Sequence, residues 1–352
     1  MLKTLLIGSY TTPETAGIRR VEVDTDAGEI RLLENVPGIG NPIYFAVDAA
    51  RSRLYAAQGA SPEAGRGSDG TLAAYALDDD FRPRLLCARS FPFTIPCHVS
   101  LDRERSRLFF AEYAKAYAGY IPLDANGAFA DGAAMAHHEG HGPNAKRQEA
   151  AHCHCAVASP NGRTLFVCDL GTDTVNAYDL VAPGLAPIPD ADFHCAPGLG
   201  PRHLVFDASG SRAYVVYELG SAVQPFAFRE GRLNPIQEPL SMLPKGFDGE
   251  TKAAAIRISP DGEWVLASNR GHDSIAAFRR RADGTLDPNP TISPLTGSFP
   301  RDFDFVGGTD CVIVGHKLSD NVGLYRFDAS SGALSRLPGT LETPRPLAFI
   351  QR

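Results

Sequence analysis

The chain has no long apolar stretch and no recognisable export signal. No run approaches the ~18 consecutive apolar residues of a membrane-spanning helix, so we expect no membrane association. The N-terminal stretch MLKTLLIGSYTTPE has neither a long apolar core nor a small-residue cleavage site. The seven cysteines are odd in number, and most lie inside strand patterns, where cysteine acts as a small hydrophobe. These features predict a cytoplasmic protein, and we expect a monomer or a weak homo-oligomer.

Several familiar catalytic motifs are also missing. The sequence contains no Gly-rich phosphate loop, no GxSxG elbow and no HExxH zinc motif. A covalent serine or cysteine mechanism is therefore not favoured, and no cofactor is expected. The net charge of −7 argues against nucleic acid as a partner.

The segment HCHC, residues 152–155, has the residue types of a metal site. In an extended strand, residues two apart share a face, so His152 and His154 would point one way and Cys153 and Cys155 the other. Four side chains placed in this way do not surround one tetrahedral zinc ion. We therefore predict that the protein holds no metal.

The chain does contain a hairpin pattern that recurs about every fifty residues. Each copy reads as an apolar strand, a turn rich in Asp, Ser, Gly and Arg, and a second apolar strand that ends on a polar residue. Six copies align on Tyr55, Phe109, Phe166, Tyr214, Leu266 and Ile313, and the opening LKTLLIGSY supplies a seventh second strand. Strand repeats of this length build propellers, in which each blade buries its faces against its neighbours. The sequence predicts an all-β fold: one domain over residues 1–352, a seven-bladed β-propeller of four-stranded antiparallel blades.

Polar residues gather at one end of these hairpins. The start of the first strand and the end of the second lie on the same side of an antiparallel hairpin, so both face one side of the disc. The strand starts hold Tyr44, His98, His154, Arg202, His203, Arg301 and Asp302, and the strand ends hold Gln58, Glu112, Asp169, Glu218, Arg270 and Lys317. This concentration of His, Arg, Glu and Lys predicts a functional site at the channel mouth. Strand ends are often exposed and polar, so a purely structural role stays open for each single residue.

The mixture of side chains suits a small anionic substrate. Arginine binds a carboxylate or a phosphate in a bidentate fork. Histidine gives or takes a proton near neutral pH. Neighbouring blades can therefore clamp a reacting carbonyl while a histidine or a carboxylate moves the proton.

These residues resemble the lactonase family of seven-bladed propellers, which includes bacterial 6-phosphogluconolactonase and the fungal 3-carboxy-cis,cis-muconate lactonising enzyme. The most specific segments are RQEAAHCHCAVASPNGRTLFVCDLGTDTVNAYDL, GPRHLVFDASGSRAYVVYEL and ISPDGEWVLASNRGHDSIAAF. The resemblance implies functional roles for His154, Arg202, Glu218 and Arg270. The chain departs from the family pattern at Arg257, where the family has His. Arg257 would select a more acidic lactone if its side chain faces the channel.

The resemblance implies an enzyme that hydrolyses a sugar δ-lactone to the free acid, the substrate being 6-phosphogluconolactone, an aldonolactone or an aldarolactone. In this hypothesis Arg202 and Arg270 hold the anionic substituent and the oxyanion. Glu218 or His154 moves the proton, and both assignments stay open. Further substrate-binding residues are expected to be His203, Arg301, Glu112, Lys317, His98 and Arg257. Two alternatives also stay open: a muconate-type cycloisomerase, which must protonate carbon, and a non-catalytic ligand-binding propeller.

Overall fold

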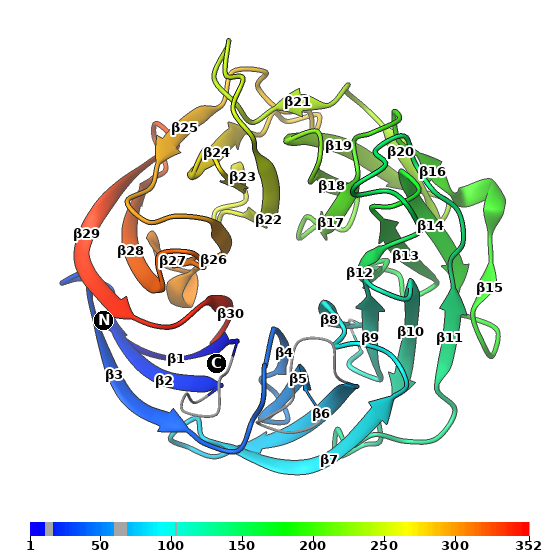
Figure 1. The fold of residues 1–352 in the computed structure, drawn as a ribbon, viewed down its shortest axis with the longest axis horizontal. Coiled ribbons are helices and arrows are strands. Elements are labelled where there is room, and N and C mark those ends of the chain that lie inside the picture. The colour runs from blue at the N-terminus through cyan, green and yellow to red at the C-terminus, as the bar shows by residue number, and fades with distance from the viewer. Residues whose placement is uncertain (11–16, 60–68, 103, 352) are drawn as a thin grey trace.

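Seven antiparallel sheets are arranged around one axis like the blades of a propeller (Figure 1). The computed structural model describes residues 1–10, 17–59, 69–102 and 104–351. Within these ranges the helical elements are two 3₁₀ turns, Pro189–Ala191 and Val306–Gly308. No helix of the described chain has the length and hydropathy needed to cross a membrane. The predicted all-β, seven-bladed fold is confirmed.

Six blades follow one another along the chain, each built from its innermost strand outward. The first is β4 (Tyr44–Asp48), β5 (Arg53–Gly59), β6 (Gly70–Leu77) and β7 (Pro83–Phe91); the second is β8 (His98–Leu101), β9 (Arg107–Glu112), β10 (Tyr117–Pro122) and β11 (Ala134–His137). The third is β12 (Cys153–Ala158), β13 (Thr164–Asp169), β14 (Thr174–Asp179), β15 (Ala186–Pro187) and β16 (Phe193–His194). The fourth is β17 (Pro201–Phe206), β18 (Arg212–Tyr217), β19 (Ala222–Arg229), β20 (Arg232–Pro235) and β21 (Leu240–Ser241). The fifth is β22 (Lys252–Ile258), β23 (Trp264–Arg270), β24 (Ser274–Arg279) and β25 (Thr291–Pro294); the sixth is β26 (Pro300–Phe305), β27 (Cys311–His316), β28 (Asn321–Asp328) and β29 (Ala333–Glu342).

The seventh blade joins the two ends of the chain. Its strands, from the axis outward, are β30 (Pro346–Gln351), β1 (Leu2–Ser9), β2 (Ile18–Asp24) and β3 (Glu29–Val36). β30 pairs antiparallel with β1, and Figure 1 shows both chain ends in this blade. The pairing closes the ring, because strand edges that an open array would expose are hydrogen-bonded instead.

Apolar side chains fill the spaces between the blades. Among the described residues, seven hydrophobic clusters occur, one at each interface between neighbouring blades. The aligned position of the repeat is at most 1% exposed in all six hairpins. Two of these side chains also link blades directly: the Tyr55 hydroxyl donates to the Gly127 carbonyl at 2.9 Å, and the Tyr214 hydroxyl donates to the Gly284 carbonyl at 3.1 Å. The repeat therefore marks the residues that hold each blade against the next.

Five innermost strands, β12, β17, β22, β26 and β30, have a register shift near their start, and three of these shifts fall at predicted site residues. The extra residue, which has no partner across the strand pair, is His154 in β12, Arg202 in β17 and Arg301 in β26. A bulge bends its strand and changes the direction of the side chain at that point. Three of the predicted functional residues are therefore placed by local irregularities of the sheet.

The bulge in β12 also corrects the expected arrangement of the HCHC segment. Cys153 and Cys155 do not share a face, because the extra residue between them changes the phase of the strand. Cys153 packs against the second blade, whereas Cys155 packs against the fourth. The four side chains still do not converge on one point.

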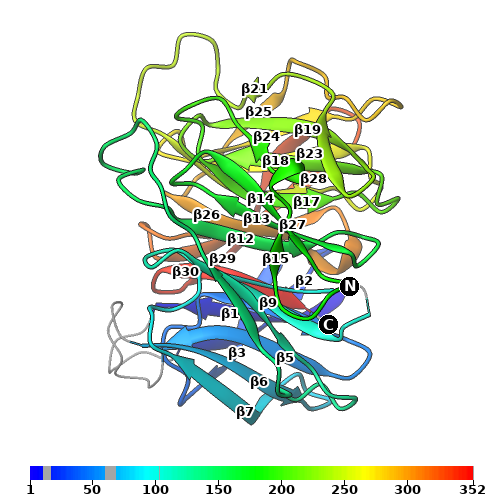
Figure 2. The same cartoon turned by 90° about the vertical axis from the view of Figure 1, so that its right-hand side faces the viewer.

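Long loops lead into several of these strand starts. Figure 2 shows the disc turned by 90°, with the loop from β11 to β12 and the loop from β21 to β22 extending from the same side. This is the face on which the predicted site residues lie.

Candidate active site

A cavity of about 260 Å³ opens where the first strands begin. Its lining is Tyr10, Ile43, Thr94, Ile95, Cys97, Tyr113, Ala114, Arg147, His154, Glu218, Arg270 and Arg301. The structure therefore brings four of the predicted site residues together on one cavity wall: His154, Glu218, Arg270 and Arg301. The other predicted residues lie beneath or beside this cavity.

Glu218 is the centre of an ionic network. This residue follows β18 and is only 2% exposed. Its Oε1 accepts a hydrogen bond from Arg147 Nη2 at 2.7 Å, and its Oε2 lies 3.0 Å from Arg202 Nε and 2.8 Å from Arg270 Nη2. Burial opposes ionisation, but the neighbouring arginines outweigh it and hold the pKa of Glu218 well below its ordinary value. One carboxylate is thus shared by three guanidinium groups.

Replacing Glu218 with Gln is expected to lower the free energy of unfolding by roughly 3 kcal/mol, because buried guanidinium groups lose their counter-charge. Denaturant unfolding at pH 7 measures this difference. The folded-state pKa of Glu218 lies below its ordinary value of 4.5, so the difference is present above pH 4.5 and is lost as the pH falls through the folded-state pKa. The control is Glu263→Gln, an exposed carboxylate that should change stability by less than about 0.5 kcal/mol. Equal stability of Glu218→Gln and wild type would contradict the network.

Arg202 lies beneath Glu218. Its side chain is 3% exposed, and its Nη1 donates to the Ala254 carbonyl at 2.6 Å. Arg202 does not line the cavity, and its guanidinium pairs with Glu218 instead, so its proposed contact with the substrate anion stays a prediction. Burial, followed by the charge of Arg270, lowers the pKa of Arg202 to about 10. Its position fits a residue that orients Glu218.

Two other arginines face the cavity directly. Arg270 ends β23; its Nη2 donates to the Ala253 carbonyl at 2.5 Å, and its guanidinium lies 5.2 Å from the Phe299 ring centroid. These contacts fix its direction. The side chain of Arg301 makes no hydrogen bond or ion pair with another described residue. An arginine without a counter-charge on a cavity wall is suited to an anionic ligand.

His154 is the histidine that lines the cavity. Its Nδ1 lies 3.8 Å from Cys97 Sγ, and its ring makes an edge-to-face contact with Tyr113 at a centroid distance of 5.7 Å. Burial and then the charge of Arg202 hold the pKa of His154 well below 6.5. The imidazole is therefore neutral at neutral pH and is able to accept a proton.

Two further predicted histidines lie behind His154, inside the channel. The His203 ring is 5.3 Å from that of His154 and 5.4 Å from that of His98. Tyr44 contacts both inner histidines, and His98 Nε2 lies 3.5 Å from Cys155 Sγ. Neither inner histidine lines the cavity, and His203 is the one whose ring contacts that of His154.

Glu112 and Lys317 also lie outside the cavity lining. Glu112 caps the turn after β9, since its carboxylate accepts hydrogen bonds from the backbone N–H of Ala114 at 2.9 Å and of Lys115 at 2.7 Å. It also accepts one from the Thr94 hydroxyl. The Lys317 ammonium lies 5.7 Å from the ring centroid of Tyr10, which lines the cavity.

Arg257 belongs to a separate ionic group. Lys252, at the start of β22, is paired with Arg270, and Arg257 lies five residues further along this strand. Its Nη2 is 2.8 Å from Asp302 Oδ1 and its Nε is 3.6 Å from Asp304 Oδ1. Two carboxylates match its charge, and Arg257 is not among the residues that line the cavity, so its effect on substrate choice stays a prediction.

The sequence reasoning missed Arg147 and Tyr113. Arg147 lies in the loop from β11 to β12, outside the repeat, and Tyr113 follows the predicted strand end at Glu112. Alignment on the hairpins therefore gave no signal for either residue. The available hint was a Lys-Arg pair in a loop that leads to the start of a first strand.

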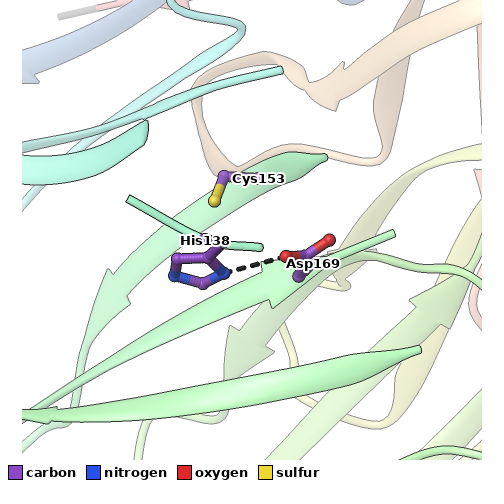
Figure 3. Close-up of side chains that lie close together, drawn as sticks. All are labelled: His138, Cys153 and Asp169. Carbon is purple, nitrogen blue, oxygen red and sulfur yellow. Dashed lines mark hydrogen bonds and ion pairs between the residues drawn. The ribbon is translucent and has the colours of Figure 1, made fainter. Parts of the chain in front are cut away.

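A second polar cluster lies under this loop. Figure 3 shows the side chains of His138, Cys153 and Asp169, whose polar atoms lie within 4.8 Å of one another. His138 Nδ1 is 2.8 Å from Asp169 Oδ2, and its Nε2 is 2.7 Å from the Tyr178 hydroxyl. Asp169 Oδ1 also accepts a hydrogen bond from the backbone N–H of His152 at 2.7 Å. Both ring nitrogens of His138 have partners, so the cluster forms a hydrogen-bond network that ties the loop to the third blade.

Comparison with known families decides the identity of this propeller. The family described as "Lactonase, 7-bladed beta-propeller" matches residues 4–350. The chain belongs to this lactonase family. It is therefore a lactonase-type enzyme, as the resemblance of its motifs implied.

Individual relatives of this lactonase cover almost the whole chain. It is 30% identical to a Bacillus subtilis 6-phosphogluconolactonase over 345 residues, which is 97% of this chain and 96% of the relative. A periplasmic gluconolactonase of Pseudomonas aeruginosa superposes with a TM-score of 0.91 at 28% identity, covering 100% and 99% of the two chains. A Lactobacillus plantarum protein gives a TM-score of 0.88 at 30% identity and covers both chains completely.

Proposed function

We propose that this lactonase hydrolyses an anionic sugar δ-lactone, either 6-phosphogluconolactone or an aldarolactone with a free carboxylate, to the open acid. The observation that carries this proposal is the charge around the cavity. Arg147, Arg202 and Arg270 pair with one carboxylate, Glu218, and Arg301 lines the same cavity. An anionic substituent on the substrate would balance the remaining positive charge.

The named relatives support a sugar lactone but differ in its substituent. The Bacillus subtilis relative is a 6-phosphogluconolactonase, and the Pseudomonas aeruginosa neighbour is a gluconolactonase. The surplus of arginine in this cavity favours the charged substrates over the neutral gluconolactone.

His154 is the proposed general base. A neutral imidazole accepts a proton from the attacking water as the new C–O bond forms at the lactone carbonyl. Glu218 is less suited to this step, because its two carboxylate oxygens are occupied by three arginines. Its negative charge favours the imidazolium that His154 becomes.

Arg270 and Arg301 are the proposed donors to the oxyanion of the tetrahedral intermediate. When this intermediate collapses, the bond between the former carbonyl carbon and the ring oxygen breaks. His154 then returns its proton to the ring oxygen, and the product is the open hydroxy acid. The step needs only water, so its atoms balance without a further reactant.

A hydrolysis screen tests the proposal. 6-Phosphogluconolactone, glucono-δ-lactone and an aldarolactone are compared with and without a chelator, and each rate is corrected for spontaneous hydrolysis. We expect the highest kcat/KM for one of the two anionic lactones and no effect of the chelator. Preference for the neutral lactone would contradict the charge argument. Formation of a lactone from a muconate, or binding without turnover, would replace the proposal by one of the two alternatives.

A further inference from the structure

Arg147 reaches the cavity from outside the propeller repeat. Its Nη2 donates to Glu218 Oε1 at 2.7 Å and to the Tyr113 hydroxyl at 3.3 Å. Its side chain is 26% exposed and lines the cavity wall. This contact joins the loop between β11 and β12 to the fourth blade.

The backbone on either side of Arg147 is held in place. The neighbouring Gln148 is fully buried, and its Nε2 donates to the Leu170 carbonyl at 3.0 Å. Its Oε1 accepts a hydrogen bond from the backbone N–H of Asn144 at 3.1 Å, and the backbone N–H of Arg147 donates to the Asn144 carbonyl at 3.0 Å. The turn that carries Arg147 is thus fixed by a buried side chain.

Both ends of the loop are fixed as well. At the first end, His138 is hydrogen-bonded to Asp169 (Figure 3) and to the Tyr178 hydroxyl. At the second end, the His152 ring stacks on Tyr113 with a centroid distance of 4.2 Å and an interplanar angle of 2°. Arg147 is therefore presented by a preorganised loop, which lowers the entropy cost of using it to bind a ligand.

Charge balance does not explain why a third arginine contacts Glu218. Arg202 and Arg270 already pair with Oε2 of this carboxylate, and each also donates to a backbone carbonyl. Arg147 has no such carbonyl partner, and its Nε and Nη1 make no hydrogen bond with another described residue. A guanidinium carries five N–H donors, so Arg147 keeps donors for a ligand in the cavity.

We propose that Arg147 is a substrate-binding residue that contacts the anionic substituent of the lactone and sets the preference for charged over neutral sugar lactones. The inference rests on the proposed function, because it assigns this role within the same cavity. The shared chemistry of the ligand is a second anionic group, a phosphate or a carboxylate, on a sugar acid.

Binding of the open acids tests this role separately from catalysis. Calorimetry compares 6-phosphogluconate, glucarate and gluconate, which share one carboxylate, while only the first two carry a second anionic group. The Arg147→Met variant is expected to lose about 10- to 100-fold in affinity for at least one doubly anionic acid, the range of a hydrogen bond to a charged group. Its affinity for gluconate should stay within about twofold of wild type. Lys146→Met removes an exposed charge from the same loop and should leave the affinity for all three acids unchanged.

The possible outcomes separate the two proposals. Unchanged affinity of Arg147→Met for both doubly anionic acids overturns the inference. An equal loss for all three acids also overturns it, because the variant would then have damaged the site in general. The expected selective loss in a protein that hydrolyses none of the lactones would support the role of Arg147 in binding and reject the proposed hydrolysis.

Discussion

Replacement of His154 with Asn is expected to lower kcat/KM for the substrate lactone by about 10²- to 10⁴-fold, the range of a general base. Asn fits the same space and keeps a polar group, but it does not accept a proton from water. His137→Asn is the control, because this histidine is exposed on β11 and does not line the cavity. Wild-type activity in His154→Asn would remove this residue from the proton transfer.

The pH profile of the wild-type enzyme gives a second measurement of the same role. The pKa of His154 is held well below 6.5, so the imidazole is still neutral when the pH falls to that value. Therefore kcat/KM should stay constant from about pH 7.5 to 6.5 and fall only when the pH passes through the lowered pKa. An acidic limb centred at 6.5, the ordinary value, would show that the site does not lower the pKa of its base.

The fold could be predicted from the sequence because each copy of the repeat has an apolar residue at the position that packs between blades. One residue of each second strand must fill the space between two blades, so Tyr55, Leu266 and their equivalents stay apolar or aromatic. The N-terminal strand could be counted as a seventh second strand for the same reason, and β1 is indeed second from the axis, paired with β30. The cytoplasmic location has no such physical basis in the fold and stays a prediction.

The site could be predicted only in part, because its geometry depends on local departures from the repeat. Hairpin alignment brought His154, Glu218, Arg270 and Arg301 to one rim, and the cavity contains all four. The alignment did not reveal that Arg202 pairs with Glu218 instead of lining the cavity, since it gives no information on bulges, whose backbone angles no single residue type dictates.

Charge pairing was equally hidden in the sequence. Arg257 pairs with Asp302 and Asp304, which lie in the first strand of the next blade. These residues meet only when the two blades pack together. Arg147 could not be predicted because it lies on a loop outside the repeat, where the hairpin alignment gives no information. Long-range contacts of this kind need coordinates.

Replacement of Arg270 with Ala is expected to lower kcat by about 10²- to 10³-fold with little change in KM, the effect of losing a donor to the oxyanion. The developing negative charge exists only in the transition state, so an arginine that serves it affects kcat more than substrate binding. Arg270→Lys should restore only part of the rate. A single ammonium cannot reproduce the planar guanidinium that contacts Glu218 and the Ala253 carbonyl while facing the cavity.

Stability must be measured beside the rate, because Arg270 is only 5% exposed and shares the buried carboxylate. Rates are therefore compared at a temperature where thermal unfolding shows both variants fully folded. Arg229→Ala, at an exposed position on β19, is the control for loss of an arginine and should leave both quantities unchanged. A folded Arg270→Ala variant with the wild-type kcat would exclude Arg270 from the transition state. A raised KM at unchanged kcat would assign it to the ground state, where it would bind the anionic substituent together with Arg147.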